Sequence, residues 1–149
     1  MGRKPRHPVL SQKALVVCRK GDILLVRRSK FEHSYPRKWE FPGGKIEPGA
    51  SLRENLVREL GEELGKRARI KEIVEVHDRL LPRNHSRRPG HHVIILFFRV
   101  LLEDYEGEIK LSGEHSAFRW VSLEAALKVR LPPGSRKALK RFRELRDKS

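Results

Sequence analysis

The chain has 149 residues, a length that suits one domain with a normal hydrophobic core. A single cysteine excludes a disulfide framework, and the lack of a long apolar run or signal-peptide pattern leads us to expect a cytoplasmic protein with no membrane partner. Lysine and arginine outnumber aspartate and glutamate by 34 to 19, and the net charge of +15 favours anionic partners such as polyphosphates, nucleotides or nucleic acid.

The first predicted elements are a basic arm and two apolar strands. Residues 1–8 (MGRKPRHP) are expected to form a basic N-terminal arm, and residues 9–149 a single folded domain. Residues 14–18 and 23–26 are apolar and partly β-branched, and a short polar turn separates them. This pattern predicts a hairpin of well-buried strands.

A helix is predicted from about residue 51 to residue 65. Ser51 and Glu54 have the spacing of a capping box, and Gly65 is a natural left-handed terminator. Four leucines repeat at helical spacing and predict the buried face of this helix: Leu52, Leu56, Leu60 and Leu64.

The polar side of the same helix carries three glutamates, Glu59, Glu62 and Glu63, at spacings that make them neighbours. Such carboxylates repel one another and raise one another's pKa. A hard divalent cation such as Mg²⁺ would remove that conflict. A solvated charged face, with Arg58 and Lys66 as ion-pair partners, accounts for the same residues without a metal.

The rest of the chain alternates between strands and helices. Strands are predicted over residues 70–77, 91–102 and 118–121, with a turn and short strand over 105–111, and helices over residues 122–129 and 135–146. The inward residues of the first of these strands are expected to be Ile70, Val74 and Val76. This alternation predicts an α/β fold, a single α/β/α sandwich domain with a central mixed β-sheet.

The glutamate helix and the segment before it resemble the Nudix box, the motif of a family that hydrolyses nucleoside diphosphates linked to another group. The matching positions are Gly44, Arg58-Glu59-Leu60, Glu62-Glu63 and Gly65, preceded by WEFPGGK at residues 39–45. The resemblance implies the Nudix fold and a Nudix-like hydrolase domain over residues 9–149. Two positions depart from the pattern: Ala50 stands where a glutamate usually supports the box arginine, and Lys66 stands where an aliphatic residue is usual.

The resemblance also implies a metal site. Glu59, Glu62, Glu63 and the backbone carbonyl of Gly43 would hold one or more Mg²⁺ or Mn²⁺ ions, and Arg58 would orient the first glutamate. The general base is expected to be Glu114, in the loop before Trp120, or Glu62 acting through the metal. His115 is a poorer choice, and Glu114 is equally well explained as an exposed loop carboxylate.

Two basic residues are candidates for binding substrate phosphate. Arg28, at the end of the second strand, matches an arginine that contacts phosphate in nucleotide-cleaving relatives, and its fork of donors suits phosphate oxygens. Lys45 follows the Gly-Gly turn and would help hold the phosphate. A surface arginine at a strand end and a lysine that merely flanks a turn are the alternatives.

The implied reaction is attack of water on a phosphorus of a small nucleotide, which releases a nucleoside monophosphate. The length, the WEFPGGK segment and the Leu-Pro-Pro at residues 131–133 are most similar to the MutT type, which hydrolyses nucleoside triphosphates. ADP-ribose and dinucleoside polyphosphates remain alternatives. An RNA 5′ end is favoured only by the positive charge, and a non-catalytic nucleotide- or RNA-binding domain only by Ala50. Ser135 stands where members selective for oxidised guanine have an asparagine.

Overall fold

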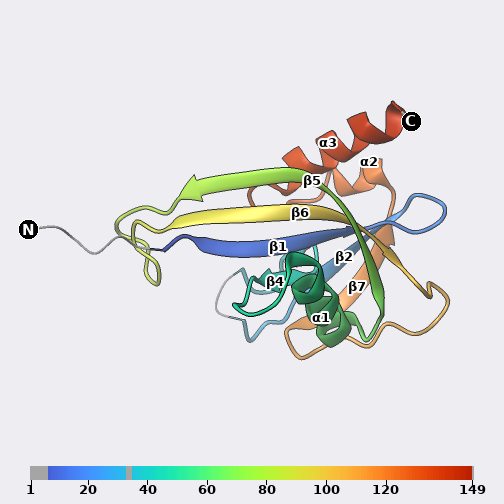
Figure 1. The fold of residues 1–149 in the computed structure, drawn as a ribbon, viewed down its shortest axis with the longest axis horizontal. Helices are drawn as coiled ribbons and strands as arrows, with labels where there is room; N and C mark the ends of the chain where they lie inside the picture. The colour runs from blue at the N-terminus through green and yellow to red at the C-terminus, as the bar shows by residue number, and fades with distance from the viewer. Residues whose placement is uncertain (1–6, 33–34, 149) are drawn as a thin grey trace, which may run out of the picture.

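The structure, a computed structural model, describes residues 7–32 and 35–148 (Figure 1). Most of the arm expected over residues 1–8 therefore lies outside the described residues. The elements in chain order are β1 (Val9–Val16), β2 (Ile23–Arg28), β3 (Trp39–Glu40), β4 (Gly43–Lys45), α1 (Leu52–Leu64), β5 (Ala68–Leu80), β6 (His92–Leu102), β7 (His115–Val121), α2 (Leu123–Ala126) and α3 (Ser135–Asp147). Among the described residues, no helix is both long enough and apolar enough to span a bilayer.

The strands form two sheets. A four-stranded sheet has the order β4-β1-β6-β5, in which β1 and β6 run parallel and the other neighbours antiparallel. A three-stranded antiparallel sheet has the order β3-β2-β7. The helices lie on both sides of the strands, with α1 on one side and α2 and α3 on the other (Figure 1). The expected α/β class with a mixed sheet between helices is confirmed.

Alternation along β1 and β2 supplies a core to each helical layer. Successive side chains of a strand point to opposite faces. Ala14 and Leu24 accordingly pack in the cluster that includes the α1 leucines, whereas Leu15 and Leu25 pack in the cluster that includes α2 and α3. These strands are therefore buried on both faces, which explains their nearly continuous apolar sequences.

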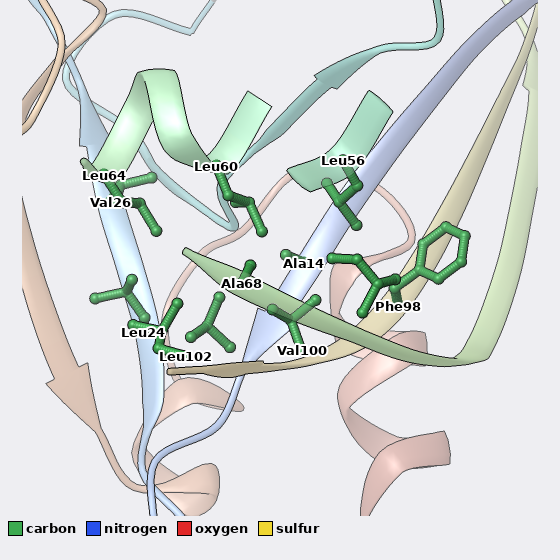
Figure 2. Close-up of a cluster of buried hydrophobic side chains, with 12 residues drawn as sticks. Ala14, Leu24, Val26, Leu56, Leu60, Leu64, Ala68, Phe98, Val100 and Leu102 are labelled. Atoms are coloured by element: carbon green, nitrogen blue, oxygen red, sulfur yellow. The ribbon is translucent and has the colours of Figure 1, made fainter. Parts of the chain in front are cut away.

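Helix α1 is held by its caps and by one leucine stripe. Ser51 accepts a hydrogen bond from the Glu54 backbone N–H at 3.1 Å, and Gly65 ends the helix with φ of 64°. Figure 2 shows the leucine side chains pointing from α1 onto the strands, and three of them are fully buried: Leu56, Leu60 and Leu64. Each contributes about 1.5–3 kcal/mol by burial. Leu52, expected in the same face, is 39% exposed at the first turn.

The prediction of a hairpin from the first two strands is partly wrong: both strands are buried and a tight turn joins them, with a hydrogen bond from the Cys18 N–H to the Asp22 carbonyl at 2.9 Å, but they do not pair along their length. A single bridge, Val17 to Ile23, joins them, and beyond it β1 and β2 belong to different sheets. The reason lies in partners that are distant in the sequence: β1 pairs with β4 and β6, and β2 pairs with β3 and β7.

The expectation for β5 is partly wrong. Ile70 and Val74 are buried, but Val76 is 46% exposed. Two register shifts, between Ile70 and Ile73 and between Ile73 and Glu75, interrupt the pairing with β6. Each bulge reverses the alternation, so the two reversals cancel. Val74, between them, packs in the cluster that includes α2 and α3, whereas Val76, opposite Leu96, returns to the side of Ile70 and is partly exposed there.

Candidate active site

A cleft of about 330 Å³ lies where β1, the β3–β4 segment, α1 and the loop before β7 meet. We call it the carboxylate cleft, because five acidic residues line it: Glu40, Glu47, Glu59, Glu63 and Glu114. Three basic residues line it as well: Lys13, Arg28 and Lys45. The cleft thus combines groups that can hold a cation with groups that can bind an anion.

The two glycines of β4 let the backbone approach the helix glutamates. The Gly43 N–H donates a hydrogen bond to Glu63 Oε2 at 2.9 Å, and a Cβ at Gly43 would collide with the Gln12 carbonyl oxygen on β1. At Gly44, a Cβ would lie 2.6 Å from the Glu59 carboxyl carbon. A larger residue at Gly43 would meet backbone atoms of β1, and one at Gly44 would displace the Glu59 carboxylate, so this Gly-Gly pair has a steric reason within the cleft.

The three helix glutamates do not occupy equivalent positions. Glu63 is 4% exposed, and the Glu59 side chain is 15% exposed. Glu62 is not part of the cleft lining; its side chain is 59% exposed and accepts a hydrogen bond from Arg58 at 3.1 Å. Arg58 also donates to Glu59 Oε1 at 3.2 Å, so it links the cleft to the outer carboxylate.

Burial makes the cleft carboxylates reluctant to ionise without a counter-ion. Burial raises the pKa of Glu63 to about 7, although Lys13, the Gly43 N–H and His115 act in the opposite direction. Burial also raises the pKa of Glu59, with Arg58 opposing it and Glu62 and Glu114 adding to it. Both shifts are expected where carboxylates crowd one another, and a bound cation would reverse them.

Glu40 is a buried anion that the sequence reasoning missed. Its carboxylate accepts hydrogen bonds from Lys13 at 3.2 Å, Arg28 at 3.1 Å and His115 Nε2 at 2.8 Å. Burial raises the pKa of Glu40, but Lys13, His115 and Arg28 outweigh burial and hold it at about 2. The available signal was the acidic residue between Trp39 and Phe41, which alternation places on the opposite face from two apolar neighbours.

The two expected phosphate ligands both line the cleft. The Arg28 side chain is 20% exposed and also donates to Glu32 at 3.4 Å. Lys45 is exposed at the rim, and its backbone carbonyl accepts a hydrogen bond from Asn55. Their position agrees with the expected role, which stays a prediction.

The donor set of the cleft fits a divalent cation. One ligand atom each from Glu63, Glu114 and His115 lies within 4.8 Å of the others. The Nδ1 atom of His115 is buried and has no hydrogen-bond partner in the described part of the chain. Carboxylate oxygens suit Mg²⁺, and oxygens together with an imidazole nitrogen suit Mn²⁺. Glu114 itself is exposed, which suits a group that has to reach a substrate or water.

An α/β/α domain that presents crowded carboxylates and cations to one cleft is typical of hydrolases that handle phosphate groups with divalent cations. A family model described as "NUDIX domain" matches residues 10–142. The chain therefore belongs to the Nudix family, and it is a hydrolase of the pyrophosphohydrolase type. The resemblance of the α1 segment to the Nudix box is thus confirmed as family membership.

Three relatives illustrate the similarity. The CTP pyrophosphohydrolase of Escherichia coli (strain K12) is 37% identical over 133 residues, which are 89% of this chain and 90% of the relative. The 8-oxo-dGTP diphosphatase of the same organism is 32% identical over 125 residues, which are 84% of this chain and 88% of that one. The crystal structure of a MutT protein from Methanosarcina mazei Go1 has a TM-score of 0.79 and 32% identity and covers 96% of this chain and 99% of its own.

Proposed function

We propose that this protein is a MutT-like nucleoside triphosphate pyrophosphohydrolase that uses Mg²⁺ or Mn²⁺ and releases a nucleoside monophosphate. The observation that carries the proposal is the carboxylate cleft, in which the buried Glu63 and the largely buried Glu59 face the basic side chains of Lys13 and Arg28. The similarity to a CTP pyrophosphohydrolase and an 8-oxo-dGTP diphosphatase, over most of each chain, supports a triphosphate substrate.

In this proposal Glu59, Glu62, Glu63 and the Gly43 carbonyl hold the metal ion. When bound, the ion neutralises phosphoryl charge and lowers the pKa of water, which is the chemistry that phosphoanhydride hydrolysis needs. Glu62 lies outside the cleft lining and accepts a hydrogen bond from Arg58, so its carboxylate would reach the metal ion from the α1 side of the cleft.

The remaining residues bind the substrate and move the proton. Arg28 and Lys45 bind phosphate oxygens from the basic side of the cleft. Glu114 accepts the proton of the attacking water, and Glu62 acting through the metal is the alternative base. His115, held by Glu40 at 2.8 Å, has a ring nitrogen within 4.8 Å of the Glu114 carboxylate and is a fixed neighbour of that base.

Ser135, which stands where members selective for oxidised guanine have an asparagine, does not line the carboxylate cleft. Ser135 is 3% exposed at the start of α3, so its hydroxyl is not presented at the surface, and we expect no selectivity for oxidised guanine. ADP-ribose and dinucleoside polyphosphates remain alternative substrates. An RNA 5′ end is the other candidate, favoured by the net charge of +15. The cytoplasmic location stays a prediction.

The test is a substrate panel with Mg²⁺ or Mn²⁺, followed by chromatography of the products. The panel contains the common and oxidised nucleoside triphosphates, ADP-ribose, a dinucleoside polyphosphate and a triphosphorylated RNA. Conversion of a triphosphate to the monophosphate, abolished by EDTA, is the expected result. Preferred cleavage of ADP-ribose, the dinucleoside or RNA would replace the proposed substrate class, and cleavage of no compound would refute the proposal.

A matched pair of variants ties any activity to the cleft. Glu59→Gln removes one charge from the cleft and is expected to lower kcat by on the order of a hundredfold or more, because it removes a metal-holding group. Glu54→Gln makes the same change at an exposed position in the first turn of the same helix. Equal losses in the two variants would show that the activity does not depend on the cleft.

A further inference from the structure

Asn55 is a polar residue with no exposed surface near the start of α1. The side chains buried beside it on this helix include Leu56, Leu60 and Leu64. Burying an amide is unfavourable unless its donors and acceptors are satisfied. A fully buried asparagine in a leucine-rich helix face therefore calls for a specific set of partners.

Those partners use all the hydrogen-bonding capacity of the amide. The Nδ2 group donates to Gln12 Oε1 at 2.6 Å and to the Lys45 carbonyl at 3.1 Å. The Oδ1 atom accepts from the Glu47 N–H at 3.1 Å and from Arg58 at 3.0 Å. Exchange of the oxygen and nitrogen would set donors against donors at Glu47 and Arg58, so only one orientation of the amide satisfies the network.

Gln12 fixes the other side of this network. It is fully buried on β1 and donates to the Leu52 carbonyl, at the start of α1, at 2.8 Å. Asn55 is thereby held against both the central sheet and the segment from Gly44 to Glu47. Its oxygen offers Arg58 an acceptor whose position is fixed by the Gln12 side chain, the Lys45 carbonyl and the Glu47 N–H.

Arg58, oriented by Asn55, donates hydrogen bonds to two carboxylates. The nitrogen that donates to Asn55 also donates to Glu59 at 3.2 Å, and the other terminal nitrogen donates to Glu62 at 3.1 Å. Position 50, where the Nudix pattern has a carboxylate that supports this arginine, is alanine. In the described part of the chain, Asn55 is the one hydrogen-bond acceptor of Arg58 besides the two glutamates that Arg58 orients.

We propose that Asn55 is a positioning residue, which fixes the Arg58 guanidinium and through it sets Glu59 and Glu62 relative to the Gly44–Glu47 segment. This inference rests on the proposed role of the two glutamates in holding the metal. A neutral amide suits the task, because it orients the guanidinium while leaving its charge to the carboxylates.

A double-mutant cycle with Asn55→Ala, Arg58→Ala and the double variant tests the inference. Asn55→Ala is expected to lower kcat by on the order of tenfold or more, the size of a hydrogen bond to a charged group, with KM nearly unchanged. In the Arg58→Ala background, the same change is expected to cost little further, because the lost contact acts through Arg58. Losses that multiply independently would overturn the proposal.

Two controls separate positioning from simple loss of stability. Tyr105→Phe removes partly buried hydrogen bonds to the Val17 carbonyl at 2.6 Å and from the Leu102 N–H at 3.0 Å, beside a part of the core that does not line the carboxylate cleft. It is expected to lower the melting temperature while kcat is unchanged. If Asn55→Ala does not fold, Asn55→Asp retains the shape and the acceptor for Arg58 but loses the donors that fix it, and a kcat equal to that of the wild type would overturn the proposal.

Mn²⁺ binding by calorimetry, without nucleotide, provides a readout that does not need turnover. Asn55→Ala is expected to weaken Mn²⁺ binding by about tenfold, in line with the effect of residues that orient metal ligands. If no nucleotide is cleaved but Mn²⁺ binding weakens in this variant, the positioning role stands and the proposed reaction fails. Unchanged Mn²⁺ affinity, or a wild-type protein that binds no Mn²⁺, would overturn the positioning role.

Discussion

Glu63→Gln is expected to stabilise the metal-free protein at alkaline pH, although it removes a group of the proposed active site. Glu63 is 4% exposed, and burial raises its pKa to about 7 from an ordinary value of 4.5. The folded state therefore binds this proton more tightly than the unfolded state does. Glutamine is neutral at every pH and keeps an oxygen that can accept from the Gly43 N–H.

The magnitude and the pH window follow from this shift. Below about pH 4.5 the carboxyl is protonated in both states and contributes no difference. Between pH 4.5 and 7 the folded state holds more protons than the unfolded state, so stability falls as pH rises. Above pH 7 the full cost, about 3 kcal/mol, remains in the wild type and is absent from the variant.

Urea denaturation in EDTA at pH 5 and pH 8.5 measures the effect. The variant is expected to exceed the wild type by about 3 kcal/mol at pH 8.5 and by much less at pH 5. Glu40 does not interfere, because its lowered pKa of about 2 places its own loss of stability below pH 4.5. Added Mn²⁺ is expected to stabilise the wild type and not the variant.

Glu62→Gln is the matched control for this experiment, because its side chain is 59% exposed on the same helix. Its stability in EDTA is expected to stay within about 0.5 kcal/mol of the wild type at both pH values. A Glu63→Gln variant that is no more stable than the wild type at pH 8.5 would refute the reasoning, as would an equal difference at the two pH values.

Three further predictions concern turnover. Glu62→Gln is expected to abolish Mg²⁺-dependent hydrolysis without changing the circular dichroism spectrum; retained activity would remove this residue from the metal site. Arg28→Ala is expected to raise KM, because it removes a phosphate ligand, and an unchanged KM would return it to a structural role. Gly44→Ala places a methyl group 2.6 Å from the Glu59 carboxyl carbon, so kcat is expected to fall on the order of tenfold or more. Its control is Gly61→Ala, which meets no atom within 4 Å and is expected to stabilise α1 by about 1 kcal/mol with kcat unchanged. A Gly44→Ala variant with wild-type kcat would contradict the close contact.

The parts of the site that lie close together in the sequence could be predicted well. The Ser51 cap, the Gly65 terminator and the buried leucines of α1 agree with the helix expected from the pattern. The helical wheel also places Glu59 and Glu63 together at the edge of the apolar arc, and these are the two α1 glutamates that line the carboxylate cleft. Helical hydrogen bonds join residues only four apart, so the pattern within the segment contains the necessary information.

The sequence by itself thus determined the family, the box helix and the acidic and basic residues available for chemistry. Only the tertiary structure showed Glu40 bound to His115, 75 positions away, and Gln12 bound to Asn55, 43 positions away. Spacing along the chain does not encode such contacts, because they depend on how β1, β3 and β7 pair and on where α1 packs. The bulges of β5 belong to the same category, since one extra residue reverses the alternation and places Val74 on the opposite face from Ile70.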